Sequence, residues 1–166
     1  MTGKPAKLTA LVADPSSNMA ALVAVMLKSL GFGSVDATVD LPHTATELGR
    51  RKYGLILLDD QLGGSDGFDM IRAIRHAADS PNRQTPIIMM ASAPDAKMIA
   101  AARDAGVSEF LRKPFSAEHI KLRLEGLNKA PRPFVDAKDY AGPDRRRRTV
   151  AGTAERRGTS KASAGN

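Results

Sequence analysis

Four consecutive arginines, Arg145 to Arg148, are the most concentrated set of chemically capable side chains in this sequence. Arginine binds phosphate oxygens through two hydrogen bonds, pairs with O6 and N7 of guanine, and stacks on flat rings. Asp144 can accept hydrogen bonds from guanine N1 and N2, and Tyr140 can stack on a base. A turn at Gly142-Pro143 would let these two side chains face one ligand. The mixture favours a guanine-containing polyanion over bare phosphate.

A second charged set follows short apolar runs. Asp14 comes after the first of these runs, Asp59 after the run 55–58, and Lys113 after the last. The run 55–58 is typical of a strand buried on both faces of a sheet. Charged residues at the carboxyl end of such a strand indicate a site.

The charge of the chain is divided unevenly. Residues 131–166 hold nine Lys or Arg against four Asp or Glu, whereas residues 1–130 hold sixteen against fourteen. The excess of positive charge therefore belongs to an appendage and not to a folded face. The chain has no cysteine, which excludes disulfides, thiolate metal sites and a cysteine nucleophile.

No segment predicts insertion into a membrane. The first seven residues contain no apolar stretch, and the longest apolar run, 19–27, is far shorter than the ~20 residues of a membrane span. We therefore expect a cytoplasmic protein.

The elements that position these residues alternate regularly along residues 7–129. Strands are expected at 8–13, 35–39, 55–58, 86–90 and 107–111, and helices end near residues 30, 52, 78, 105 and 127. This alternation predicts an α/β fold, a (βα)5 doubly wound parallel sheet of five strands with ligands at the carboxyl ends of the strands. Asp14, Asp59, Ala91 and Lys113 all fall at such ends.

The remaining residues, 130–166, are expected to form a tail. Pro131-Arg132-Pro133 ends the last helix, because proline cannot continue the helical hydrogen bonds. The polar composition beyond Val150 predicts disorder in the free protein and folding only on a ligand.

Residues 7–129 resemble the receiver domain of bacterial response regulators, in particular the CheY family of the flavodoxin-like fold. The resemblance rests on Asp14, Tyr53-Gly54, Asp59, Asp66-Gly67, Ala105-Gly106-Val107 and Lys113-Pro114-Phe115. It implies that Asp59 accepts a phosphoryl group from a histidine kinase, that Asp14 and Asp59 form a weak Mg²⁺ site, and that Lys113 senses the phosphoryl oxygens. It also places Phe110 at the aromatic switch position and implies a cis Lys113-Pro114 peptide. The protein would be no enzyme beyond this self-phosphorylation.

Two departures from the receiver pattern weaken this chemistry. Pro15 replaces the second residue of the usual acidic pair, and Ala91 replaces a Ser or Thr hydroxyl. Asp60 and Ser92 do not substitute, because successive side chains of a strand point to opposite faces.

The tail resembles the arginine-rich extension of the Cle proteins, CheY-like regulators that bind cyclic di-GMP. The resemblance implies that the tail binds cyclic di-GMP, alone or as a stacked dimer, and favours docking of a monomeric protein to the flagellar motor switch. The output face would carry Ile99, Arg103, Val107, Phe110 and Arg123. The implied ligand-binding residues are Arg132, Tyr140, Asp144, Arg145, Arg146, Arg147 and Arg148.

Two other functions stay open. The arginine run is also typical of nonspecific RNA or DNA binding through phosphates, although no specific nucleic acid is expected. Alternatively, the protein is an ordinary phosphorylation-controlled regulator whose tail is only a solvated appendage.

Overall fold

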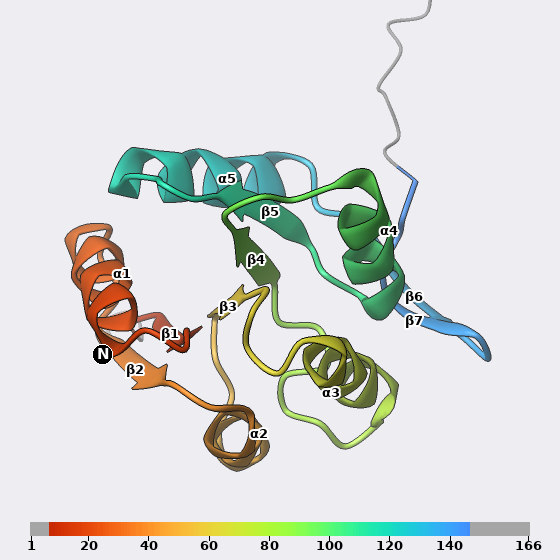
Figure 1. Ribbon diagram of the computed structural model, residues 1–166. Helices are drawn as coiled ribbons and strands as arrows, with labels where there is room; N and C mark the ends of the chain where they lie inside the picture. Colours follow the sequence, from red (N-terminus) through yellow and green to blue (C-terminus); the bar gives the residue numbers. More distant parts are fainter. Residues whose placement is uncertain (1–6, 147–166) are drawn as a thin grey trace, which may run out of the picture.

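The computed structural model describes residues 7–146. In this part of the chain five strands alternate with five helices, and a hairpin follows them (Figure 1). The strands of the main sheet are β1 Thr9–Ala13, β2 Ser34–Thr38, β3 Leu55–Asp59, β4 Ile87–Ala91 and β5 Glu109–Arg112. The helices are α1 Ser17–Ser29, α2 Leu41–Arg50, α3 Ser65–His76, α4 Ala96–Ala105 and α5 Ala117–Lys129. The hairpin consists of β6 Phe134–Ala137 and β7 Tyr140–Pro143.

The main sheet is parallel throughout, with the strand order β2-β1-β3-β4-β5. This confirms the predicted doubly wound α/β fold. Every residue of β3 and β4 is buried, as expected for central strands that have helices on both sides. One core cluster joins the sheet to α2, α3 and α4, and a second joins it to α1 and α5 (Figure 1).

Side-chain caps fix the loops at the carboxyl ends of the strands. Ser16 accepts a hydrogen bond from the backbone N–H of Met19 at the start of α1, and Asp95 accepts one from Met98 at the start of α4. Among residues 7–146, no helix combines the length and the apolar character needed to cross a bilayer.

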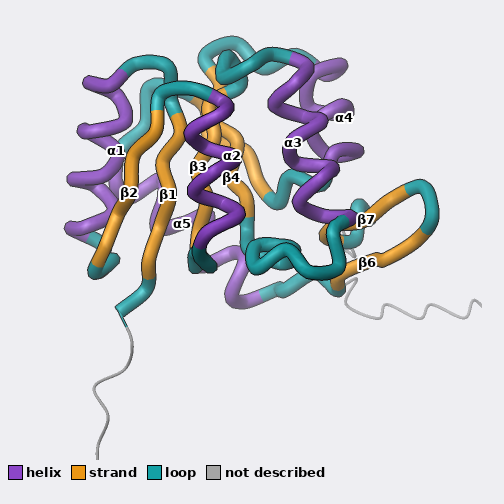
Figure 2. The backbone as a smooth tube through the Cα atoms, turned by 90° about the horizontal axis from the view of Figure 1, so that it is seen from below, coloured by secondary structure: helices purple, strands orange, loops and turns teal. Residues whose placement is uncertain are grey.

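Residues 134–143 form an antiparallel hairpin that the sequence analysis did not predict. Ala137 pairs with Tyr140, so Lys138 and Asp139 make the turn. The turn expected at Gly142-Pro143 is instead part of β7. The hairpin lies beside α3 and α4, toward the edge of the sheet where the strands begin, and β7 contacts both helices (Figure 2).

The buried guanidinium of Arg75 forms the floor beneath the hairpin. Its Nε donates to the carbonyl oxygen of Gly106 at 3.1 Å, and its Nη1 donates to those of Arg83 and Thr85 at 2.7 and 2.8 Å. Its Nη2 has no acceptor among the described residues. Burial lowers the pKa of Arg75 to about 10. Arg75 therefore ties the end of α3 to the segments that precede β4 and β5.

The hairpin approaches this floor closely at Gly106. Gly106 ends α4 with a φ of +111°, a conformation that favours glycine. A Cβ atom there would meet Arg75 Cγ at 2.8 Å and the carbonyl oxygen of Ala141 at 3.1 Å. Tyr140 and Ala141 are buried at this contact. An ion pair of 2.6 Å between Arg83 and Asp136 also holds β6 to the domain.

Candidate functional site

Parallel topology brings Asp14, Asp59 and Lys113 together at the carboxyl ends of β1, β3 and β5. The Nζ atom of Lys113 lies 2.7 Å from Asp14 Oδ2 and 2.5 Å from Asp59 Oδ2. Both carboxylates are almost completely buried, with exposed fractions of 2% and 4%. The Lys113-Pro114 peptide is cis, as the receiver resemblance implied. The structure therefore unites the three residues of the acidic pocket.

The electrostatics of this pocket hold the lysine in its charged form. Burial opposes the ammonium, but hydrogen bonds to Asp14 and Asp59 and the attraction of their charges outweigh it. The net result is a pKa of Lys113 above its ordinary value. The ammonium thus acts as the internal counter-ion of two buried carboxylates.

The pocket fits Mg²⁺ poorly. Mg²⁺ requires a near-octahedral set of oxygen ligands. Oδ1 of Asp14 already accepts from the backbone N–H of Ser16, Oδ1 of Asp59 accepts from that of Gln61, and Lys113 engages both Oδ2 atoms. Within residues 7–146 no three His, Cys, Asp or Glu side chains are grouped as metal ligands. The pocket itself therefore offers a metal ion two carboxylates, each of which already accepts two hydrogen bonds.

The two departures from the receiver pattern lie beside this pocket. Pro15 follows Asp14 and is exposed, and Ala91 is buried at the end of β4, where its carbonyl oxygen accepts from the backbone N–H of Lys113. The carboxylate of Asp60 accepts from the side chain of Gln61.

The expected output face is only partly exposed. Phe110 is half-buried and packs against the core, and its carbonyl oxygen accepts from Arg123. Arg103 and Arg123 are exposed, and Ile99 is half-buried. Val107 has an exposed fraction of 3%, so it belongs to the core and cannot contribute to a docking surface.

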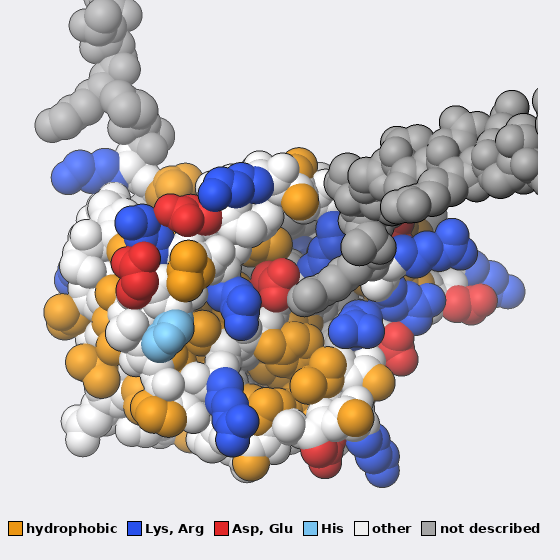
Figure 3. Space-filling view, turned by 90° about the horizontal axis from the view of Figure 1, so that it is seen from above, with side chains coloured by type: hydrophobic (Ala, Val, Ile, Leu, Met, Phe, Trp, Pro, Cys, Tyr) orange, Lys and Arg blue, Asp and Glu red, His pale blue; other side chains and the backbone are white. Residues whose placement is uncertain are grey.

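The second site lies on the outer side of the hairpin. Tyr140, Asp144, Arg145 and Arg146 line one open cavity of about 560 Å³. That volume falls within the range of small-ligand sites, roughly 300–1,000 Å³. The cavity is also lined by Val135, Ala137, Lys138 and Asp139. Basic side chains gather on this side of the molecule (Figure 3).

The sequence predicted that Tyr140 stacks on a base, but the structure buries its ring. Its ring is buried, with an exposed fraction of 6%, and its hydroxyl donates to the carbonyl oxygen of Pro143 at 2.6 Å. The guanidinium of Arg145 lies 4.4 Å from the ring centroid. Burial raises the pKa of Tyr140 although Arg145 and other cations oppose the shift. Tyr140 thus supports the exposed side chain of Arg145.

Asp144 and Arg132 are tied into the fold. The carboxylate of Asp144 accepts from the backbone N–H of Arg146 at 2.9 Å. Arg132 donates to the carbonyl oxygen of Ser108 and lines a different cavity, beside Pro143. Arg132 also donates to the carbonyl oxygen of Asp144 at 3.4 Å, so it contacts the predicted tail residues although it lines a different cavity. Arg147 and Arg148 lie outside the described residues.

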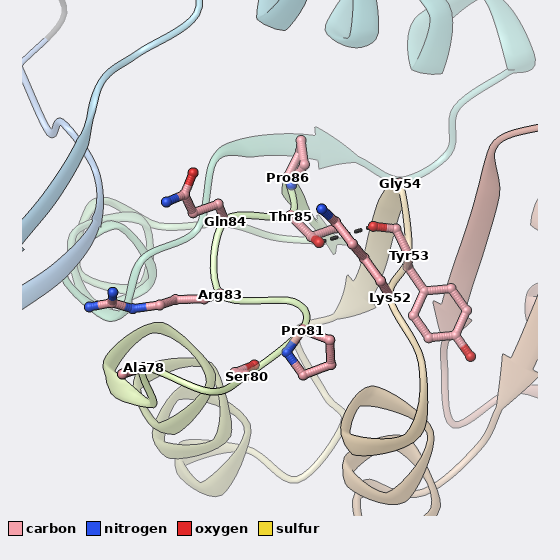
Figure 4. Close-up of a pocket in the computed structure, with 10 residues that line it drawn as sticks. All are labelled: Lys52, Tyr53, Gly54, Ala78, Ser80, Pro81, Arg83, Gln84, Thr85 and Pro86. Carbon is pink, nitrogen blue, oxygen red and sulfur yellow. Dashed lines mark hydrogen bonds between the residues drawn. The ribbon is translucent and has the colours of Figure 1, made fainter. Parts of the chain in front are cut away.

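A further cavity, of about 490 Å³, opens at the amino ends of β3 and β4 (Figure 4). Lys52 and Arg83 line it, but the side chain of Arg83 extends away from Lys52 (Figure 4). Thr85 donates to the carbonyl oxygen of Tyr53 at 3.0 Å and closes its inner wall. Its two cations do not converge on one point.

A five-stranded doubly wound domain with two carboxylates and a lysine at its carboxyl edge has the architecture of a signalling receiver. The response regulator receiver domain family matches residues 10–125. The chain belongs to this family.

Individual relatives agree with this assignment. The chain is 28% identical over 117 residues to the chemotaxis protein CheY of Pseudomonas aeruginosa, which covers 70% of this chain and 93% of that protein. It is equally identical, at 28%, to CheY-3 of Vibrio cholerae over 70% of this chain and 88% of that protein.

Solved structures give the same fold. CheY4 of Vibrio cholerae superposes with a TM-score of 0.62 at 22% identity, over 74% of this chain and 98% of that one. The receiver domain of the sensor histidine kinase PA1611 from Pseudomonas aeruginosa superposes with a TM-score of 0.63 at 25% identity, over 75% of this chain and all of that one. The PA1611 structure has a magnesium ion coordinated in its active-site cleft.

Sequence reasoning missed two residues that shape the hairpin site. Arg75 follows Gly67 and Ile71 at helical spacing on the buried face of α3, so its position on a core face was readable from the periodicity. Asp104 is exposed in the last turn of α4 and pairs with Arg145 at 2.7 Å. No signal in the sequence joins two residues so far apart.

Proposed function

We propose that this receiver-family protein is a cytoplasmic effector of cyclic di-GMP, and that the hairpin and the arginine run that follows it form the binding site. Binding favours docking to the flagellar motor switch and thereby adjusts motility and surface attachment. The observation that carries this proposal is the convergence of Tyr140, Asp144, Arg145 and Arg146 on one open cavity.

The chemistry of that cavity suits a cyclic dinucleotide. Arg145 stacks on Tyr140 and leaves one guanidinium face for a purine ring. Arg145 and Arg146 are exposed and supply donors for phosphate oxygens. Arg147 and Arg148 continue the run along the chain. A ligand with two guanines and two phosphates, alone or as a stacked dimer, uses both kinds of contact.

The altered acidic pocket supports control by a ligand in place of phosphorylation. Lys113 already pairs with both Asp14 and Asp59, and Pro15 and Ala91 carry no side-chain oxygen. The chemotaxis names of the relatives CheY and CheY-3 support a role in motility.

Selectivity tests the proposal against nonspecific polyanion binding. Cyclic di-GMP and cyclic di-AMP are titrated calorimetrically into the full chain at one fixed salt concentration. We expect binding of cyclic di-GMP alone, because O6 and N7 of guanine are both acceptors for an arginine fork whereas adenine presents a donor beside N7. Equal binding of both nucleotides would favour contact with phosphates alone.

Phosphorylation of Asp59 by a histidine kinase is the second candidate function. It is favoured by the contact of Asp59 with Lys113 at the carboxyl edge of the sheet. The test is intact-mass measurement after incubation with Mg²⁺ and acetyl phosphate, with Asp59→Asn as the matched control. A phosphorylated wild-type chain and an unmodified variant would establish Asp59 as a phosphoacceptor.

A further inference from the structure

Arg145 already has an anionic partner in the folded domain. Its Nη1 atom lies 2.7 Å from Oδ1 of Asp104, while its guanidinium stacks on Tyr140. The side chains of Arg145 and Asp104 are 48% and 58% exposed, so solvent and ligands reach both. This ion pair links the end of the hairpin to the last turn of α4.

The position of Asp104 is unfavourable for its own helix. The carbonyl end of a helix carries partial negative charge, which repels a carboxylate in the last turn. Asp104 is the second-last residue of α4. The pairing with Arg145 offsets that repulsion and gives the carboxylate a role in the contact between α4 and the tail.

A phosphate and the Asp104 carboxylate are equivalent partners for one guanidinium. A bidentate phosphate uses two adjacent N–H groups of the arginine, and Asp104 occupies one of the Nη donors. A phosphate bound beside an intact pair would also be repelled by the carboxylate. The Tyr140 contact places the guanidinium carbon 4.4 Å from the ring centroid and uses no N–H donor of Arg145, so it is compatible with a bound phosphate.

We propose that Asp104 is an internal competitor for the phosphate that binds Arg145, and that ligand binding breaks the Asp104–Arg145 pair and frees the Asp104 side chain. This inference rests on the proposed function, because it concerns the same cyclic dinucleotide site. By linkage, a protein that binds the freed Asp104 carboxylate raises the affinity for the nucleotide, and the nucleotide raises the affinity for that protein by the same factor.

The test compares Asp104→Asn with a matched variant, Asp69→Asn. Asp69 is also exposed and also pairs with an arginine, Arg72, at 2.6 Å, but both residues belong to α3. Each substitution removes one negative charge, so the change in net charge is the same in both. Cyclic di-GMP is titrated calorimetrically into the full wild-type chain and both variants at fixed salt.

We expect Asp104→Asn to bind cyclic di-GMP about two- to fivefold more tightly than wild type, the range set by an exposed ion pair. Asp69→Asn should bind like wild type. The competitor role would be overturned if both variants bound equally more tightly, or if Asp104→Asn bound cyclic di-GMP as wild type does or more weakly. Each of these results would leave the proposed function intact. A wild-type chain that does not bind cyclic di-GMP would refute the proposed function, and the competitor role with it.

Discussion

Tyr140 anchors the hairpin to the domain, and its replacement by Ala should release the hairpin while the main sheet stays folded. The ring is 6% exposed, and its hydroxyl donates to Pro143 within the same hairpin. Removal of a buried aromatic ring costs about 3–5 kcal/mol in a well-packed core. Because the hairpin is an outlying element, we take the lower end, about 3 kcal/mol. A two-stranded hairpin is marginal by itself, so the loss appears as local opening.

Amide hydrogen exchange measures this opening directly. A change of about 3 kcal/mol lowers the protection of β6 and β7 amides roughly a hundredfold, whereas β4 amides should change far less. Tyr140→Phe is the matched control: it keeps the ring and loses one hydrogen bond, worth about 1 kcal/mol, so protection falls only about fivefold. Hairpin protection that is the same in Tyr140→Ala and wild type would refute the anchoring role.

Three other predictions concern the interior of the domain. Arg75→Met should lower the free energy of unfolding by about 3 kcal/mol or more in urea titrations. The reason is that three carbonyl oxygens lose the buried donor they share. An unchanged midpoint of urea unfolding would contradict this. The pKa of Lys113 is higher in the folded than in the unfolded protein. The stabilisation that follows is complete at pH values below 10.5 and is lost as the pH rises through the pKa of the folded state. The free energy of unfolding should therefore fall less above pH 10.5 in Lys113→Met than in wild type. Pro15→Asp should tighten Mg²⁺ binding in calorimetry by roughly tenfold, about 1.4 kcal/mol, by adding an oxygen ligand. Equal affinity in the variant and wild type would contradict the role given to Pro15.

The hairpin also changes how the tail should be tested. A chain ending at Lys129 loses β6 and β7 and uncovers the floor around Arg75, so its failure to bind would not locate the ligand. Substitutions within the full chain keep that contact.

The sheet and the acidic pocket followed from the sequence because their signals are local. The apolar runs 55–58 and 86–90 predicted central strands, and parallel topology then required Asp14, Asp59 and Lys113 to meet at one edge. The prediction that Val107 lies on the output face was wrong, because alignment with a family does not say whether a side chain is buried.

The hairpin could not be predicted in the same way. Its turn, Lys138-Asp139, lacks the glycine or asparagine of the common two-residue hairpin turns, and neither residue has a positive φ. The hairpin is held by tertiary contacts, the Arg83–Asp136 pair among them. Contacts between segments so distant in the chain leave no periodic signal.

The most direct test of the central claim is a calorimetric titration of cyclic di-GMP into the full chain and into two double variants. Arg147→Ala with Arg148→Ala removes two arginines of the proposed site, and Arg156→Ala with Arg157→Ala removes the same charge farther along the tail. We predict that the first pair of substitutions abolishes binding and that the second leaves it close to wild type, with the circular dichroism spectrum of the domain unchanged in both. Unchanged affinity in the first variant, or equal losses in the two, would contradict a guanine-nucleotide site built on the arginine run.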